Sequence, residues 1–331
     1  MMSLRESTIL KGVAILFMLY LHLFNRLENV DLCITHLAVG NIPLVHLFTR
    51  CTNPVPFYLI LSGYGLYASY KSGKKQNSLK RVLKLYIHYW ITLVLFVFLG
   101  CWVIGSEIYP GSFEKILENF GGWRTSYNSE IWFLFPYILL VFFATHLFRF
   151  LDRMGFLPTI LIISTLLLAS NILISLFGSS YLYSHYWVLK FVLYMGLLFP
   201  FMLGAMMVKY DIVNKFKIGG GKSFFLLLLI MVGRMCMETA ILNSLYAALF
   251  IILFIQLNRT TYLDNFLYEM GRRSTSMWLI HSYYCYYLFK DFIYGFKYPL
   301  MIFIVLLVIS YLSAVVVDWI NRPLQNLMKR C

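Results

Sequence analysis

The stretch KGVAILFMLYLH, residues 11–22, decides the fold, because it is an apolar helix with a cation at its start and a histidine at its end. Lys11 and His22 are eleven residues apart, about three helical turns, so both side chains lie on nearly the same helix face. Their axial separation is roughly 16 Å at ~1.5 Å per residue. A titratable ring inside a membrane span is costly, which makes His22 a functional-site hypothesis. A buried histidine that hydrogen-bonds to a neighbouring helix is the alternative, and these residues alone leave it open.

The composition is that of an integral membrane protein. The chain has 331 residues, 60% of them hydrophobic, and a mean hydropathy of +0.74. Apolar runs of membrane-spanning length recur throughout. The net charge of +14 would suggest a nucleic-acid partner for a soluble protein, but cytoplasmic loops of membrane proteins collect Lys and Arg. We therefore expect one all-α transmembrane domain over residues 1–331, in contact with membrane lipid and with no nucleic-acid partner.

About ten spans are predicted from the apolar runs, with both termini in the cytoplasm. With the N-terminus inside, the cytoplasmic segments hold twenty Lys and Arg residues and the outer segments seven, while Lys190 falls within a span. This asymmetry supports the orientation. The predicted spans cover residues 8–26, 54–70, 84–105, 130–149, 157–177, 184–208, 223–238, 240–257, 274–293 and 299–320.

The segments between the spans carry further expectations. The basic segment 71–83 either orients the protein and contacts anionic lipid, or binds a phosphorylated cytoplasmic ligand. The acidic segment 106–129 is predicted as a loop with one short interfacial helix. Residues 219–223 read GGGKS, yet neither the preceding glycine nor the strand of a phosphate-binding loop is present, so we interpret them as a flexible connector. Arg234 and Glu238 are expected to pair along one helix.

Cysteine and histidine positions predict no metal site. The six cysteines are widely separated. Cys33 and Cys51 share one polar loop and form either a disulfide or two free thiols, of which we favour the thiols. Five histidines other than His22 and His281 are interpreted as interfacial polar residues rather than ligands: His36, His46, His88, His146 and His185.

Several segments, taken in order, resemble the acyltransferase-3 family of integral membrane acyltransferases. The basic residue at Lys11, ten residues before His22, resembles that family's first helix. The other similar segments are PFYLILSGY at 56–64, KRVLKLY at 80–86, EIWFL at 130–134, STSMWLIH at 274–281 and the Arg-Pro pair at 322–323. Each motif is short, but the ordered set covers essentially the whole chain.

Three residues depart from the family pattern. Thr8 stands where many members have Asp, and Asn321 stands where a Glu is usual. Lys11 replaces the commoner Arg. Lysine keeps the positive charge but lacks the planar guanidinium group that makes two parallel hydrogen bonds, so phosphate binding at this position is expected to be weaker.

The resemblance implies an enzyme that transfers an acyl group, most often acetyl, from cytoplasmic acyl-CoA to a carbohydrate hydroxyl. Acyl-CoA is then a donor substrate rather than a resident cofactor. The acceptor is a cell-surface polysaccharide or its lipid-linked precursor, and we expect the protein in the cytoplasmic membrane of a bacterium.

The residues suggest how such a reaction would work. Lys11, Arg81 and Lys84 gather at the cytoplasmic mouth, where CoA phosphates need cations. The ~16 Å to His22 is comparable with an extended pantetheine arm. His22 would take the proton of the acceptor hydroxyl or accept the acyl group itself. Glu130 and Trp132 would orient His22 or hold a sugar ring, although Trp132 also suits the aromatic belt of a membrane protein.

Four further polar residues are predicted to line the cavity, with ordinary hydrogen bonding between helices as the alternative. They are Ser62, Tyr64, Ser276 and His281. Two other classes of function stay open at this point. Ten spans with a polar centre would also suit a transporter or flippase of a glycan or lipid precursor, although no paired broken helices are evident. A sensor or structural membrane protein would tolerate loss of both Lys11 and His22.

Overall fold

The computed structural model describes residues 2–74 and 77–330, and side chains through residue 326. It is 77% helical, and in the described part the strands β1 (Ala38–Val39) and β2 (Ile42–Pro43) form one small antiparallel pair. The α-helices are α1 (Leu4–Phe24), α2 (Leu27–Val30), α3 (Leu44–Thr49), α4 (Val55–Lys71), α5 (Ser78–Val103), α6 (Phe113–Gly121), α7 (Leu134–Met154), α8 (Phe156–Phe177), α9 (Tyr186–Lys209), α10 (Ile212–Lys215), α11 (Gly220–Met235), α12 (Asn243–Phe254), α13 (Thr261–Ser282), α14 (Lys290–Tyr294) and α15 (Pro299–Arg330). Three short turns of other helix types are η1 (Ser129–Ile131), η2 (Gly178–Leu182) and η3 (Tyr283–Tyr287).

The helices are those of a multi-pass membrane protein. Within the described residues, six helical segments are long and apolar enough to cross a membrane, namely Leu4–Phe24, Ser78–Val103, Ser129–Met154, Phe156–Leu182, Tyr186–Lys209 and Pro299–Asn326. The four other predicted spans overlap α4, α11, α12 and α13. Of these, α4, α11 and α12 have 17, 16 and 12 residues, so ten crossings and the sides of the termini stay predictions.

The predicted span over 274–293 was wrong in its boundaries. Helix α13 already begins at Thr261, where the Thr260 side chain caps it by accepting a hydrogen bond from the Leu263 N–H. It ends at Ser282, and the chain then passes through η3 before the separate short helix α14. The early start was missed because residues 261–273 include four charged side chains, which hide a helix from a hydropathy argument.

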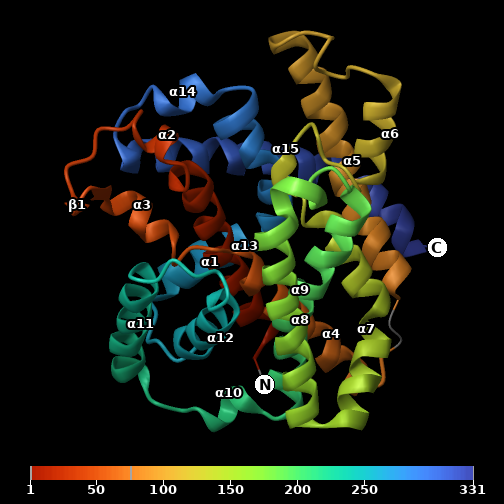
Figure 1. The fold of residues 1–331 in the computed structure, drawn as a ribbon, viewed down its shortest axis with the longest axis vertical. Helices are drawn as coiled ribbons and strands as arrows, with labels where there is room; N and C mark the ends of the chain where they lie inside the picture. Colours follow the sequence, from red (N-terminus) through yellow and green to blue (C-terminus); the bar gives the residue numbers. More distant parts are fainter. Residues whose placement is uncertain (1, 75–76, 331) are drawn as a thin grey trace.

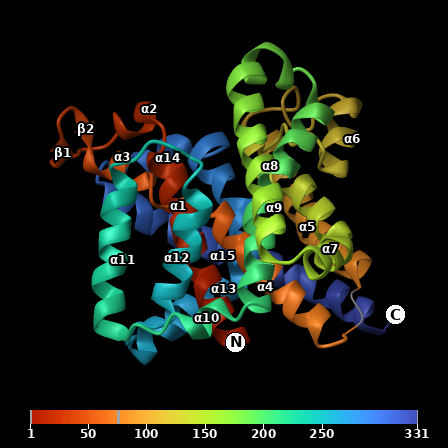
Figure 2. The same ribbon diagram turned by 60° about the horizontal axis from the view of Figure 1, so that its bottom comes forward.

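Helices α1 and α13 pack against each other in the middle of the bundle (Figure 1, Figure 2). Two glycines permit this close crossing. A Cβ at Gly12 would lie 1.9 Å from the Leu267 carbonyl oxygen, and one at Gly271 would lie 1.8 Å from the Thr8 carbonyl oxygen. Small residues let helix backbones approach closely inside membranes, and this approach sets the register between α1 and α13.

A second glycine pair joins α4 to α9. A Cβ at Gly63 would lie 1.9 Å from the Phe201 carbonyl oxygen, and one at Gly204 would lie 2.0 Å from that of Ile60. Gly63 belongs to the second-helix motif, so part of that motif serves helix packing. The ribbon views show α11 and α12 on one side of the central pair and α7, α8 and α9 on the other (Figure 1, Figure 2).

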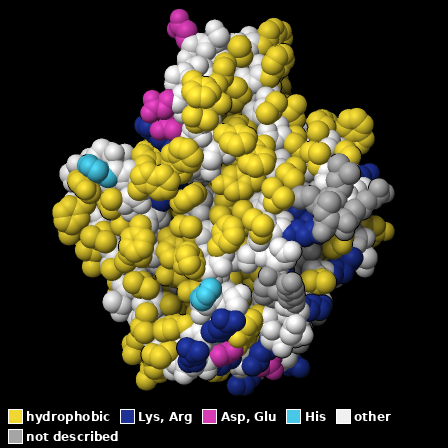
Figure 3. Space-filling view, turned by 90° about the vertical axis from the view of Figure 1, so that its right-hand side faces the viewer, with side chains coloured by type: hydrophobic (Ala, Val, Ile, Leu, Met, Phe, Trp, Pro, Cys, Tyr) yellow, Lys and Arg dark blue, Asp and Glu magenta, His cyan; other side chains and the backbone are white. Residues whose placement is uncertain are grey.

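The bundle has two ends, which we name by the ends of α1. The Lys11 end is where α1 begins, near α10, and the His22 end is where α1 runs into α2, beside α14 (Figure 2). On the face shown in Figure 3, hydrophobic side chains cover much of the surface from the top to the lower left, and most of the visible Lys and Arg lie in the lower half. Asp and Glu appear both at the upper left and near the bottom. Helix α6, the short helix expected within 106–129, is near the top of Figure 1.

Three smaller expectations have clear outcomes. Cys33 and Cys51 are free thiols. The pairing of Arg234 with Glu238 was wrong, because α11 ends at Met235 and the chain turns away, so that Glu238 pairs with Arg50 instead. The interpretation of residues 219–223 as a connector was wrong from Gly220 onward, where they form the first turn of α11.

Candidate active site

A cavity of about 950 Å³ runs from the Lys11 end to His22. Residues of α1, α4, α5, α7, α13 and α15 line it, together with the turn η1. Lys11 and His22 both face it. The eleven-residue spacing therefore places both side chains on the cavity face of α1, as helix geometry requires.

His22 lies against Glu130 at one end of this cavity. The Nδ1 atom of His22 is 3.5 Å from Oε2 of Glu130, which is ion-pair range but not a well-formed hydrogen bond, and Nδ1 is otherwise buried without a partner. His22 is among the residues that line the cavity. An imidazole with a carboxylate beside Nδ1, on a residue that lines a cavity, can act as a general base through its other nitrogen.

Local structure explains how these two residues meet. Helix α1 starts with a capping box in which Ser3 accepts from the Glu6 N–H and Glu6 accepts from the Ser3 N–H. Glu130 lies in η1, where the Asn128 side chain accepts a hydrogen bond from the Glu130 N–H at 3.2 Å. Asn128 is in turn held by the Ser282 hydroxyl of α13, at 2.9 Å. The turn that carries Glu130 is thus anchored to α13, the same helix that packs against α1.

The other Glu130 oxygen faces an arginine from the His22 end. Nη2 of Arg26 is 3.4 Å from Oε1 of Glu130, and the guanidinium lies over the Tyr286 ring, 4.4 Å from its centroid. The Tyr286 hydroxyl donates to Asn25, which lines the cavity. Glu130 therefore bridges a half-exposed cation and a buried imidazole. Glu130 was expected beside His22 from the sequence, but its contact with Arg26 was not anticipated.

The opposite end of the cavity is basic. Its lining includes Lys11, Lys74, Arg81 and Lys84, together with Gln325 of α15. Arg81 and Lys84 are neighbours on the first turns of α5, whose N-cap Asn77 accepts from the Lys80 N–H at 2.9 Å. Cations on two helices around one opening suit a ligand with phosphate groups.

The structure brings most of the predicted site residues to this one cavity. Seven of the ten line it: Lys11, His22, Ser62, Arg81, Lys84, Glu130 and Trp132. Ser62 shares a hydrogen bond of 3.0 Å with the Tyr137 hydroxyl at the cavity wall.

Tyr64, Ser276 and His281 are not on the cavity wall. Tyr64 is about 120° around α4 from the lining face, and its hydroxyl accepts from the Met2 N–H. Ser276 faces α15, where it donates to Asp318 at 2.5 Å. His281 is fully buried behind His22, with ring centroids 4.9 Å apart. The motif at 274–281 lines the cavity with Ser274, Thr275 and Trp278 instead.

His88 is one of several polar groups in the cavity that were not placed there from the sequence. His88, interpreted as interfacial, lines the cavity one turn beyond Lys84. Its ring lies 3.6 Å from Asp318 and is contacted by the Asn321 amide at 2.7 and 2.9 Å. Asp318 also accepts from Arg273 at 3.0 Å. At the position where the family usually has Glu, this chain thus places a neutral amide against His88. The Lys84–His88 spacing of four residues was the available signal.

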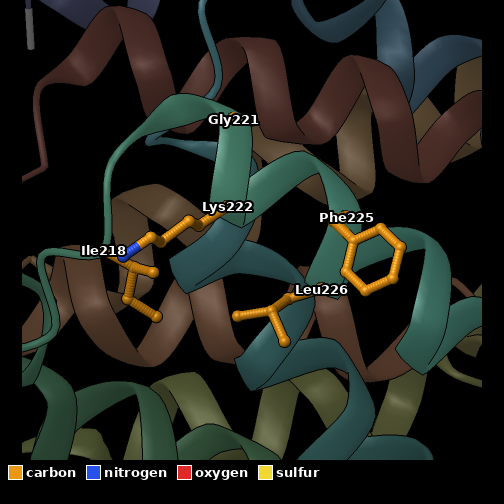
Figure 4. Close-up of a pocket in the computed structure, with 5 residues that line it drawn as sticks. All are labelled: Ile218, Gly221, Lys222, Phe225 and Leu226. Atoms are coloured by element: carbon orange, nitrogen blue, oxygen red, sulfur yellow. The ribbon is translucent and has the colours of Figure 1, made fainter.

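A second, smaller hollow of about 420 Å³ lies at the start of α11 (Figure 4). It is lined by Ile218, Gly221, Lys222, Phe225 and Leu226. Lys222 extends toward Ile218 above the apolar side chains (Figure 4). None of the predicted site residues lines this hollow, so it carries no part of the chemistry around His22.

Comparison with known proteins agrees with the ordered motifs. The family model described as "Acyltransferase domain", that of acyltransferase-3, matches residues 5–319. No curated protein and no solved structure matches the chain. The matched region spans every residue that lines the large cavity except Leu4 and Gln325.

Proposed function

The chain belongs to the acyltransferase-3 family and is a multi-pass membrane acyltransferase, and from this premise we propose its reaction. An acyl group, acetyl in the first instance, passes from cytoplasmic acyl-CoA to a hydroxyl of a cell-surface polysaccharide or its lipid-linked precursor. The observation that carries this proposal is the continuous cavity from the Lys11 end to His22. Such a passage suits a donor with a charged head and a long thioester arm.

The proposed donor position follows from charge and length. Lys11, Arg81 and Lys84 bind the phosphates of CoA by charge-assisted hydrogen bonds. The pantetheine arm then extends along α1 over roughly 16 Å, which brings the thioester carbonyl to the His22 end. Apolar cavity residues, Met18 and Leu21 among them, exclude water from this arm.

The proposed chemistry is attack of the acceptor hydroxyl on the thioester carbonyl. His22 Nε2 takes the hydroxyl proton as the new C–O bond forms, and Glu130 beside Nδ1 stabilises the resulting imidazolium. The C–S bond then breaks, and the proton passes to the CoA thiolate, which leaves as the free thiol. An acyl-histidine formed on Nε2 before acceptor attack is the alternative order of the same steps.

The acceptor side of the proposal involves Glu130, Trp132 and the polar wall. Trp132 lines the cavity beside Glu130, where its ring offers a stacking face for a sugar. Ser62 and Tyr137 offer hydroxyl groups farther along the cavity. The half-exposed Arg26 at the His22 end is positioned for an acceptor that arrives from that side.

The proposed topology has ten crossings, both termini in the cytoplasm, and the bacterial cytoplasmic membrane as its location. The Lys11 end then faces acyl-CoA and the His22 end faces the outside. Helices at or near all ten predicted positions support this arrangement. Reporter fusions after residues 74, 126 and 217 are expected to report cytoplasm, outside and cytoplasm, respectively.

The decisive experiment compares the wild-type protein with His22→Ala in proteoliposomes loaded with labelled acetyl-CoA. We expect the wild type to acetylate glycan and release free CoA thiol, and the variant to insert normally and do neither. His36→Ala, in an exposed loop, is the matched control and should retain full activity. Acetyl transfer by purified His22→Ala would falsify the role of His22. Passage of unmodified glycan without consumption of acetyl-CoA would instead indicate a flippase.

A further inference from the structure

A lysine buried in the wall of the bundle is left unexplained by the proposed chemistry. Lys190 lies on α9, within a segment long and apolar enough to cross a membrane, and is 3% exposed. Across the described side chains, no Asp or Glu lies within ion-pair distance of it. Its Nζ donates one hydrogen bond, 3.0 Å long, to the Trp132 carbonyl oxygen. Burying an ammonium group within a membrane span costs free energy, so a lysine with only this one hydrogen bond is a candidate for a functional role.

The Trp132 carbonyl needs a donor from outside its own helix because of Pro136. In an α-helix, the carbonyl of residue i accepts the N–H of residue i+4. Pro136 is the residue four positions after Trp132, and proline has no N–H. The next carbonyl, that of Phe133, receives the Tyr137 N–H at 3.0 Å. Lys190 therefore donates to the one carbonyl at this junction that proline deprives of its helical donor.

This carbonyl closes the turn that carries Glu130. The turn η1 spans Ser129–Ile131, and α7 begins at Leu134. On the α13 side, Asn128 is held by Ser282. On the α9 side, the hydrogen bond from Lys190 holds the junction between η1 and α7. The two anchors lie on either side of Glu130 in the chain.

We propose that Lys190 is a positioning residue of the acyl transfer, whose ammonium substitutes for the backbone N–H that Pro136 lacks. It keeps η1 in the conformation that aims Glu130 at His22 and Trp132 at the cavity. Lys190 itself does not line the cavity, so its charge acts on the backbone rather than on a ligand. This inference rests on the proposed function of His22 and Glu130.

The test is a double-mutant cycle in the full-length protein, reconstituted in proteoliposomes and assayed with acetyl-CoA. Lys190→Met removes the donor, and displacement of Glu130 by about 1 Å is expected to lower kcat ~10- to 100-fold, with the KM for acetyl-CoA unchanged. Pro136→Ala alone should stay near wild type. Combining the two should restore most of kcat, because the backbone N–H regained at position 136 takes over the Trp132 carbonyl.

Each outcome bears on the inference. Lys190→Arg, which still donates, is expected to retain most of kcat. If Lys190→Met raises KM and Pro136→Ala does not rescue it, Lys190 binds a ligand. If Lys190→Met lowers kcat and Pro136→Ala does not rescue it, Lys190 has a general packing role. Either result overturns the inference. If Lys190→Met does not accumulate in membranes, Lys190→Gln is used in its place. Glutamine is neutral, and its shorter side chain reaches the Trp132 carbonyl oxygen less well than lysine does. Failure of the proposed function is seen separately, as activity retained in His22→Ala.

Discussion

The imidazole rings of His22 and His281 lie with their centroids 4.9 Å apart and their planes at 71°. The Nδ1 of His281 faces the carbonyl oxygens of Trp278 and Met277, at 2.8 and 3.2 Å. Because carbonyls only accept, Nδ1 carries the proton, and the buried Nε2 is left without a partner. His281 therefore supports the face of the His22 ring by packing, and no hydrogen bond from its Nε2 contributes.

The first prediction separates packing from chemistry at His281. His281→Phe keeps a flat ring against His22, so its rate of acyl transfer should stay within about threefold of wild type. His281→Ala opens a cavity, so its rate should fall at least about tenfold and its free energy of unfolding by ~2–4 kcal/mol. Initial rates and thermal unfolding in detergent measure both effects. Equal loss in the two variants would mean that the His281 nitrogens take part in the reaction.

The second prediction concerns the crossing of α1 and α13. Gly271→Ala places a Cβ 1.8 Å from the Thr8 carbonyl oxygen, and since both groups belong to helix backbones, the helices must separate. A loss of ~1–3 kcal/mol or more is expected, seen as a lower melting temperature and weaker activity. Gly233→Ala, with no atom within 4 Å of the added Cβ, is the matched control. An unchanged melting temperature for Gly271→Ala would contradict the close crossing.

The third prediction ranks the two partners of Glu130. Glu130→Gln keeps the shape but removes the charge that stabilises the His22 imidazolium, so kcat should fall by about 10²-fold. Arg26→Gln should cost roughly tenfold or less, because Arg26 is 47% exposed at its side chain and its ion pair is screened by solvent. Steady-state kinetics of both variants and of the pair decide the ranking. A larger loss for Arg26→Gln would place Arg26 closer to the reacting atoms than proposed.

The fourth prediction addresses the basic end of the cavity. Lys84→Ala should raise the KM for acetyl-CoA by ~5- to 50-fold with little change in kcat, because a phosphate loses one charge-assisted contact. Lys11→Arg should leave the KM for acetyl-CoA unchanged or lower it, since a guanidinium can donate two hydrogen bonds to one phosphate. The control is Lys217→Ala, an exposed loop lysine outside the cavity. A KM that is insensitive to Lys84→Ala would remove Lys84 from the donor site.

The fifth prediction follows from the thiols near the His22 end. Burial raises the pKa of Cys51 to about 12 and that of Cys33 to about 11, so at pH 7–8 both are almost wholly protonated. Only the thiolate reacts with maleimide, and modification of both cysteines should be slow and should accelerate as the pH rises. Cys236 is exposed and should react first. Peptide mass spectrometry after timed labelling gives the order, and early labelling of Cys51 would contradict its burial.

Local pattern was sufficient for much of the fold. Apolar runs placed helices at or near every predicted span, since a helix in lipid must satisfy its own backbone hydrogen bonds. The shared face of Lys11 and His22 was predictable for the same reason, because the spacing of side chains around one helix depends on that helix alone. Charged residues within 261–273 concealed the start of α13, and helix ends were accordingly less well predicted than helix positions.

The sequence by itself determined a helical membrane protein, the ordered motifs of its family, and the axial distance between a cation and an imidazole on α1. The tertiary structure decided which residues meet between helices: Glu130 with Arg26, His88 with Asn321, and Lys190 with the Trp132 carbonyl. These pairs are separated by 104, 233 and 58 residues. Their contact depends on the rotation and close approach of packed helices, which no single helix's pattern encodes.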